Sequence, residues 1–300
     1  MNQDAVMNNV SGVLVVDKPI GLSSHDVVQI VRRGTGIRRA GHTGTLDPRA
    51  SGVLVVLIGP AVRLSEFISA DDKRYQATIR LGSSTDTYDG EGVPSGPEVD
   101  VDVSREEFEE ILQGYIGEIE QIPPAYSAVK VQGKKAYEMA RKGEEVELEP
   151  RIIQVHSLEL LEWALPEVVV DVHCSSGTYV RSLANDIGEE LGVGAHLAGL
   201  RRTKSGSFSL REAVSLRQLR DDFETGEWAK NLIPAADALS EWKTVEVDED
   251  DLKRLVNGNR IPIQPGDTGM ARAISQQGEL VAIIEVDGDE WQPRKVFFQS

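Results

Sequence analysis

Short apolar runs alternate along this chain with segments whose apolar positions recur at helical spacing. Residues 12–16 (GVLVV) and 53–58 (VLVVLI) are rich in β-branched residues, which predicts two buried strands. Residues 75–81 alternate between polar and apolar positions, as a half-buried strand does. Between the first two runs, Val27 and Val31 are separated by one helical turn and predict a helix.

The second half of the chain has a strand followed by a helix. Residues 167–174 (EVVVDVHC) place every second side chain on one face, which predicts a strand. Residues 180–191 then carry apolar side chains at i, i+3, i+4, i+7 and i+11. Strands and helices do not alternate strictly, and no glycine-rich phosphate motif follows a strand. The pattern therefore predicts a mixed α+β fold and not a doubly wound sheet.

A change in pattern near residues 234–244 predicts a domain boundary. Beyond it, strand candidates at 271–274 and 280–286 are separated by Gly-Asp turns, which is typical of a small β module. We therefore expect a main domain over residues 1–235 and a small β-rich domain over residues 240–300.

Composition and charge narrow the class of protein. The chain has 300 residues and a formal net charge of −17, which by itself argues against a nucleic-acid partner. The acidic residues, however, lie in blocks, while one stretch is basic and predicts a binding face. That stretch contains Arg32, Arg33, Arg38, Arg39, Arg49, Arg63, Lys73 and Arg74. An ordinary solvated surface is the alternative interpretation.

The cellular compartment is also predicted from sequence. The single cysteine excludes a disulfide framework and fits a reducing, cytoplasmic compartment. Residues 1–11 are polar and lack a signal pattern, so we do not expect export. No apolar run is long enough for a bilayer, so we expect no membrane association.

The segment at residues 41–54 (GHTGTLDPRASGVL) is the strongest candidate for chemistry. Its glycines and threonines specify a particular backbone path, and Pro48 holds Asp47 away from helical torsions. A carboxylate on such a loop between basic neighbours is a candidate nucleophile or base. A turn aspartate that caps its own backbone is the other interpretation.

This segment resembles the catalytic motif of the TruB family of pseudouridine synthases, which make pseudouridine at position 55 in the T loop of bacterial tRNA. Further blocks resemble the family in the same order, and the likeness covers roughly residues 12–210. These blocks are 17–24 (DKPIGLSS), 72–75 (DKRY), 81–89 (LGSSTDTYD), 121–128 (QIPPAYSA), 133–137 (GKKAY), 174–181 (CSSGTYVR) and 194–202 (GAHLAGLRR). The resemblance implies a pseudouridine synthase-type α+β fold, with a mixed, largely antiparallel sheet flanked by helices, and a C-terminal PUA-like RNA-binding domain.

The resemblance also implies catalytic residues. Asp47 is implied to be the catalytic carboxylate, and its step is left open among attack at C1′, attack at C6 and removal of a proton from C2′. Arg181 is implied to be its partner, which would keep a buried Asp47 ionised. Tyr75 is implied to stack on the target base and assist proton movement.

Substrate-binding residues follow from the same resemblance. Tyr179 is implied to line the pocket and Leu200 to form its wall. His42 is the natural wedge for the space left by a flipped base. Phosphate contacts are expected from a set of basic residues, and such contacts position the RNA without reading its bases. That set is Lys18, Arg38, Arg39, Lys130, Lys134, Lys135, Arg201 and Arg202.

The implied reaction is an isomerisation, so we expect no cofactor. We also expect no metal, since His25 and His42 without further ligands make a poor zinc site. The expected partner is the tRNA T stem-loop, with no protein partner required and a monomeric enzyme.

Three alternatives remain open. One is an RNA-binding or tRNA-folding module without catalysis. Another is a hydrolase that uses Asp47 with Asp86 or Asp89 as a carboxylate pair. The third is a guide-RNA-dependent relative, although the short C-terminal module favours a self-sufficient enzyme.

Overall fold

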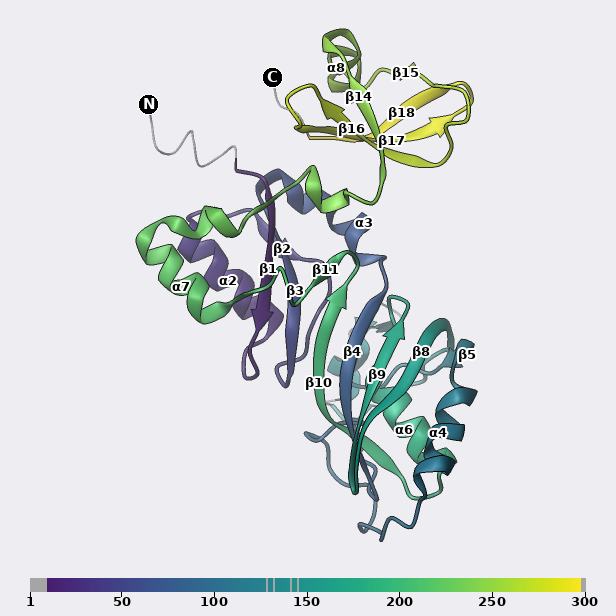
Figure 1. The fold of residues 1–300 in the computed structure, drawn as a ribbon. Helices are drawn as coiled ribbons and strands as arrows, with labels where there is room; N and C mark the ends of the chain where they lie inside the picture. The colour runs from purple at the N-terminus through teal and green to yellow at the C-terminus, as the bar shows by residue number, and fades with distance from the viewer. Residues whose placement is uncertain (1–9, 128, 132, 141, 145, 298–300) are drawn as a thin grey trace. The chain divides into compact units, whose positions relative to one another are not determined.

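The computed structural model describes residues 10–297 except 128, 132, 141 and 145. Two compact units make up the chain. The first comprises residues 1–47, 54–69 and 207–300, and the second comprises residues 48–53 and 70–206. Figure 1 labels most of the larger elements of both units. None of the helices in the described part of the chain is long and apolar enough to cross a membrane.

The first unit contains the strand and helix predicted at the start of the chain. Strand β1 (Gly12–Lys18) carries five consecutive buried residues, 12–16, and pairs in parallel with β12 (Val214–Ser215). Helix α2 (Ser24–Thr35) begins with a capping box at Ser23 and buries Val27, Val28 and Val31. Gly34 of α2 packs against Phe223 of α7 (Leu216–Thr225) so closely that a Cβ would lie 2.1 Å from the ring.

The remaining elements of this part of the first unit are short. They are β2 (Ala40–His42), η1 (Gly59–Leu64), α3 (Ser65–Ser69), β11 (Phe208–Ser209), η2 (Glu227–Asn231), β13 (Ile233–Pro234) and η3 (Asp237–Leu239).

The second unit is built on an antiparallel sheet with the strand order β10–β4–β9–β8–β5. These strands are β10 (Ala195–Ser205), β4 (Lys73–Leu81), β9 (Glu167–Cys174), β8 (Arg151–Ala164) and β5 (Gly117–Gln121). Strand β3 (Ala50–Ile58) pairs with β10 in parallel over Ala50–Gly52. The predicted mixed, largely antiparallel α+β fold is therefore confirmed.

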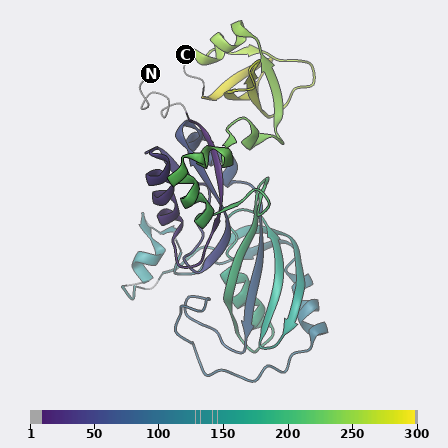
Figure 2. The ribbon, with the colours of Figure 1, turned by 60° about the vertical axis from the view of Figure 1, so that its left-hand side comes forward.

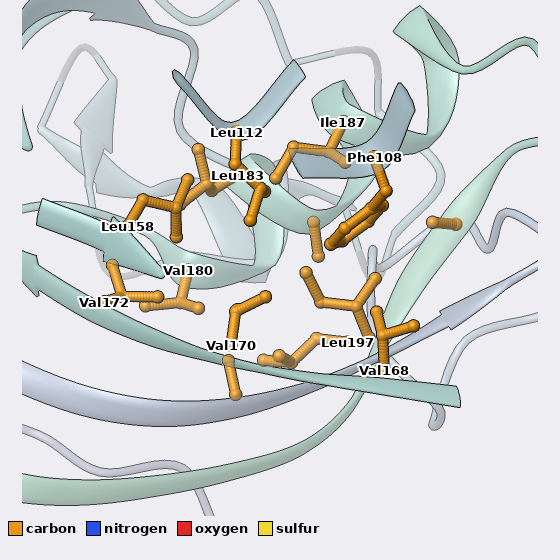
Figure 3. Close-up of a cluster of buried hydrophobic side chains, with 14 of the residues drawn as sticks. Phe108, Leu112, Leu158, Val168, Val170, Val172, Val180, Leu183, Ile187 and Leu197 are labelled. Carbon is orange, nitrogen blue, oxygen red and sulfur yellow. The ribbon is translucent and has the colours of Figure 1, made fainter. Parts of the chain in front are cut away.

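Two helices cover one face of this sheet, and Figure 2 shows the sheet from a second side. Phe108 and Leu112 of α4 (Arg105–Gly114) pack with Leu183 and Ile187 of α6 (Val180–Glu190) against residues 168–172 of β9 (Figure 3). The even-numbered side chains of β9 are buried, as its pattern predicts. Burial raises the pKa of the Cys174 thiol to about 11. Short elements β6 (Lys130–Val131), β7 (Lys134–Lys135) and α5 (Ala136–Ala140) complete the unit.

The C-terminal residues form a five-stranded sheet with the order β14–β16–β17–β18–β15. Its elements are β14 (Lys243–Val247), α8 (Glu249–Val256), β15 (Ile261–Pro262), β16 (Met270–Ser275), β17 (Leu280–Asp287) and β18 (Glu290–Val296). Leu255 and Trp291 are fully buried in a core of its own, which fits the predicted β module. The compact units nevertheless divide the chain differently from the predicted 1–235 and 240–300, because residues 48–53 and 70–206 cluster apart from the rest of the predicted main domain.

Candidate functional site

The loop that carries Asp47 is anchored to β3 within the first unit. Strand β2 pairs with β3 so that His42 lies opposite Val56, and the next amide, Thr43 N–H, donates to the carbonyl of Val55 over 3.2 Å. The Thr43 and Leu46 side chains are buried, whereas Asp47 is exposed. The loop thus presents the carboxylate at the surface from a fixed base. This corrects the expectation that Asp47 is itself buried.

A buried serine holds the residue before Asp47. Ser24 Oγ donates to the carbonyl of Leu46 over 2.9 Å and accepts from its amide over 2.8 Å. Both backbone groups of Leu46 are therefore satisfied by one hydroxyl from the first turn of α2. Any rotation of the Leu46 peptide units would break one of these bonds, so Ser24 is a positioning residue for Asp47.

Lys18 is buried, and its expected contact with phosphate stays a prediction. Its ammonium donates to the carbonyls of Leu22 at 2.7 Å and Pro19 at 3.0 Å, and its exposure is 0%. With its side chain fully buried, Lys18 offers little surface to an incoming phosphate. Lys18 therefore orders the loop that leads into α2, in which Gly21 adopts a φ of +93°.

Arg181 forms an ion pair within the second unit that its sequence motif does not reveal. Its guanidinium donates to Asp89 Oδ2 over 3.0 Å and to the carbonyl of Tyr126 over 3.2 Å. The two side chains are only 13% and 17% exposed, so solvent screens the pair weakly. Because Asp89 lies on a loop and Arg181 on α6, the pair ties these segments together.

Asp89 is itself held by its neighbours. Its Oδ1 accepts from Thr87 Oγ1 over 2.6 Å and from the Glu91 amide over 3.0 Å. Asp89 belongs to the block at residues 81–89 that carried the family resemblance, and one open alternative named it as a catalytic carboxylate. The family motif therefore indicated that Asp89 was important. It could not reveal the contact with Arg181, because the two residues are far apart in the chain.

The start of α6 is clamped by the segment at residues 121–127. The side chain of Gln121 accepts from the Tyr179 amide over 2.8 Å and donates to the Tyr179 carbonyl over 3.1 Å. Ser182 Oγ donates to the carbonyl of Ile122 over 2.8 Å. These bonds fix the backbone on both sides of Arg181, so its guanidinium starts from a rigid helical turn. Residue 128, the last of the motif 121–128, lies outside the described residues.

Tyr75 and Leu200 lie on the sheet of the same unit. Tyr75 is opposite Arg202 of β10, and Leu200 is opposite Ala77 of β4. Both side chains are partly buried and pack against the core that also contains Val180, the residue before Arg181. The second unit therefore carries two of the predicted residues at the start of α6, Tyr179 and Arg181, and two on strands β4 and β10, Tyr75 and Leu200.

The structure divides the predicted site residues between the two units. Lys18, His42 and Asp47 belong to the first, whereas Tyr75, Tyr179, Arg181 and Leu200 belong to the second. The pairing of Asp47 with Arg181 stays a prediction.

The residues expected to contact phosphate differ in exposure. Arg38 and Arg39 are exposed. Arg202 is only 2% exposed and donates through Nε to the carbonyl of Val53 over 2.7 Å, so it is a structural residue of the β3–β10 pair. The side chains of Lys130 and Lys135 lie outside the described residues.

Chemically, the first unit offers a carboxylate and a histidine, and the second offers a guanidinium and aromatic faces. Among the residues that the structure describes, the one group of three clustered metal-ligating side chains lies elsewhere, at Asp72, His156 and His173. The sequence predicted no metal, on the grounds that His25 and His42 lack further ligands, and it did not consider this group.

Three family models match the chain in succession. They are "TruB family pseudouridylate synthase (N terminal domain)" over residues 32–180, "tRNA pseudouridylate synthase B C-terminal domain" over 181–257 and "tRNA Pseudouridine synthase II, C terminal" over 242–298. A curated relative from Solibacter usitatus, called tRNA pseudouridine synthase B, is 43% identical over 92% of this chain and 95% of its own length. Relatives of the same name include one from Dehalococcoides mccartyi, 41% identical over 96% of this chain and 97% of its own, and one from Symbiobacterium thermophilum, 46% identical over 85% of both.

Solved structures agree with the sequence comparisons. A chain in a crystal structure titled as a Cbf5–Nop10–Gar1 complex matches with a TM-score of 0.77 and 27% identity, over 99% of this chain and 88% of that one. A chain in an H/ACA RNP bound to a substrate RNA containing 2′-deoxyuridine matches with a TM-score of 0.75 and 25% identity, over 99% and 88%.

Proposed function

Because this chain belongs to the TruB family of pseudouridylate synthases, we propose that it converts the uridine at position 55 in the T loop of tRNA to pseudouridine. The observation that carries the proposal is that a tRNA pseudouridine synthase B aligns with almost the whole length of this chain. The relative from Solibacter usitatus, a tRNA pseudouridine synthase B, aligns over 92% of this chain at 43% identity. Both the loop of Asp47 and the C-terminal module lie within regions that family models match.

The reaction rearranges one nucleoside without gain or loss of atoms. The bond from N1 of uracil to C1′ breaks, the base turns, and a bond from C5 to C1′ forms. C5 loses its proton and N1 gains one, so no electron carrier is required. We assign the carboxylate role to Asp47, acting at C1′, at C6 or at the C2′ proton. Its exposed position on an anchored loop supports this assignment, because an incoming nucleotide can reach it.

We assign Arg181 the role of orienting the carboxylate and the flipped nucleotide. Its ion pair with Asp89 and its bond to the Tyr126 carbonyl support this role, since they hold the guanidinium in one orientation before RNA arrives. Tyr75 is assigned to stack on the uracil, which contributes about 1–3 kcal/mol. Tyr179 and Leu200 are assigned to the wall of the same pocket.

The target uridine lies inside a folded loop and must be extruded first. Flipping costs a few kcal/mol, and a planar side chain that fills the vacated space offsets part of this cost. We assign this wedge role to His42, which lies on β2 and is followed by the loop that ends in Asp47.

An assay with an unmodified tRNA transcript tests the proposal. The purified chain alone is expected to form pseudouridine at the T-loop uridine, without a protein partner or guide RNA. We expect the enzyme to act on tRNA in the cytoplasm. Asp47→Asn is expected to abolish conversion while RNA binding is retained, because the amide keeps the shape but loses the charge. Asp221→Asn, at an exposed aspartate on α7, is the matched control and should convert normally.

The other outcomes separate the alternatives. Binding without conversion by the unaltered chain would indicate an RNA-binding or tRNA-folding module. Release of free uracil would indicate a hydrolase. Conversion only after addition of a protein partner or guide RNA would contradict the proposed self-sufficiency.

A further inference from the structure

We propose that Asp72, His156 and His173 form a binding site for a divalent transition-metal ion in the second unit. One ligand atom from each of the three side chains lies within 4.8 Å of the others. The site is separate from the residues assigned to uridine conversion, and its chemistry does not depend on that assignment.

Strand pairing brings His173 and Asp72 together. His173 lies between Val172 and Cys174, whose side chains are buried in the core, so it points to the opposite face of β9. On β4, Arg74 pairs with His173 and Lys73 pairs with Cys174, so Asp72, the residue just before β4, lies two residues from Arg74 and diagonally across from His173. The amide of Gly206 donates to the Asp72 carbonyl over 2.9 Å and holds this backbone in place.

A β-bulge brings the third ligand to the same place. On β8, Val155 pairs with Cys174 and Ser157 pairs with His173, so His156 is the extra residue of the bulge. Val155 and Leu158 are fully buried, and the two residues between them are not. A regular strand would alternate at this point, whereas the bulge redirects the side chain of His156.

The distances already approach those of a metal centre. His156 Nε2 lies 3.0 Å from Asp72 Oδ2, and the rings of His156 and His173 have centroids 4.7 Å apart at an angle of 46°. Ligand atoms about 2.0–2.2 Å from one ion lie roughly 3 Å apart when they are adjacent. Small rotations of partly exposed side chains therefore suffice to close the site around an ion.

The ligand types indicate which ion fits. Two imidazoles and one carboxylate suit zinc and neighbouring first-row ions, and three protein ligands leave a position open for water. The cation of Arg74 is engaged by Asp171, with Nε 2.5 Å from Oδ1. Lys204 also contributes positive charge near His173, so we expect modest affinity. The competing explanation is that His156 and Asp72 form only a surface ion pair.

Cobalt(II) is the probe for this site, because ligand fields from imidazole and carboxylate change its visible absorption. Untagged full-length protein, freed of metal by a chelator, is titrated with Co²⁺, and Zn²⁺ is then added as a competitor. One equivalent of Co²⁺ is expected to bind and to be displaced by Zn²⁺. His156→Gln and His173→Gln should each weaken binding at least about tenfold, as expected for the loss of one ligand.

His25→Gln is the matched control, because His25 is an exposed histidine on α2 in the other unit. It should bind Co²⁺ as the unaltered chain does. Circular dichroism of each metal-free variant checks that the fold is intact. The proposal is overturned if the unaltered chain shows no saturable Co²⁺ spectrum, or if a folded His173→Gln variant binds Co²⁺ with unchanged affinity.

Discussion

Ser24 and Leu46 are 22 residues apart in the chain, yet one hydroxyl satisfies both backbone groups of Leu46. Ser24 is 2% exposed, so water has little access to replace these bonds. Lys18 orders the loop that precedes α2, and Ser23 caps that helix. A short series of polar contacts thus leads from β1 to the residue before Asp47.

Ser24→Ala is expected to lower both stability and the rate of conversion. It leaves a buried amide and carbonyl of Leu46 without partners, at a cost of about 1–3 kcal/mol. Urea unfolding measures the first effect, and single-turnover conversion at saturating tRNA measures the second.

Ser215→Ala is the control for Ser24→Ala. Ser215 accepts from the Gln218 amide and caps α7. Its loss should lower the free energy of unfolding by roughly 0.5–2 kcal/mol without slowing conversion. Equal rates for the two variants would show that Ser24 does not position Asp47.

Asp89→Asn tests the ion pair that holds Arg181. Removing one charge from a mostly buried pair leaves the other uncompensated, and a loss of about 3 kcal/mol in unfolding free energy is expected. Conversion should slow as well, because Arg181 is no longer held in one orientation. Thermal unfolding and single-turnover rates measure the two effects.

Asp86→Asn provides the comparison for Asp89→Asn on the same loop. Asp86 is exposed and accepts one hydrogen bond from the Val93 amide, which an asparagine oxygen can also accept. Asp86→Asn should therefore change neither the free energy of unfolding nor the conversion rate appreciably. A loss of stability similar to that of Asp89→Asn would contradict the role given to the ion pair.

Strand β3 passes close to the backbone of β10 at a glycine. Gly52 has a φ of +100°, and a Cβ there would lie 2.1 Å from the Arg202 carbonyl oxygen. Arg202 in turn donates to the Val53 carbonyl. A glycine five residues after Asp47 therefore sets the course of β3 beside β10.

In Gly52→Ala the left-handed backbone strain alone should cost about 1–3 kcal/mol of unfolding free energy. The steric contact of the new Cβ with the Arg202 backbone adds to this cost, so we expect a larger total loss. Gly114→Ala is the matched control, since nothing lies within 4 Å of its Cβ position and alanine favours a helix. Denaturant unfolding of both variants decides the matter, and a Gly52→Ala variant as stable as Gly114→Ala would refute the argument.

Charge distribution governs how an acidic chain of net charge −17 binds RNA. Affinity for tRNA should fall steeply with salt, with a slope of about 0.7–0.9 per phosphate neutralised. Arg38 is exposed, so Arg38→Ala should remove one phosphate contact and lower the slope by about 0.7–0.9. The rate of conversion at saturating tRNA should stay unchanged. Filter binding across a salt series measures the slope.

The control is Arg105→Ala, because Arg105 is exposed on the acidic helix α4 and pairs with Glu109. Its salt slope should match that of the unaltered chain. If Arg38→Ala also leaves the slope unchanged, the basic stretch does not contact phosphate.

Much of the fold was predictable because burial follows local periodicity. The apolar runs at 12–16 and 53–58 lie in strands β1 and β3, and the even-numbered residues of β9 are buried as expected. The family was also predictable, since its motifs are contiguous in the chain. The roles of Asp47, Tyr75 and the other site residues stay predictions.

The contacts that were missed join segments distant in the chain. The ion pair of Arg181 with Asp89, the two bonds of Ser24 to Leu46, and the burial of Lys18 depend on where separate elements meet. The His156 bulge is another case, because one extra residue changes which face a side chain occupies. Amino-acid order along the chain encodes periodicity and contiguous motifs directly, whereas strand register and the satisfaction of buried polar groups arise only once the elements pack together.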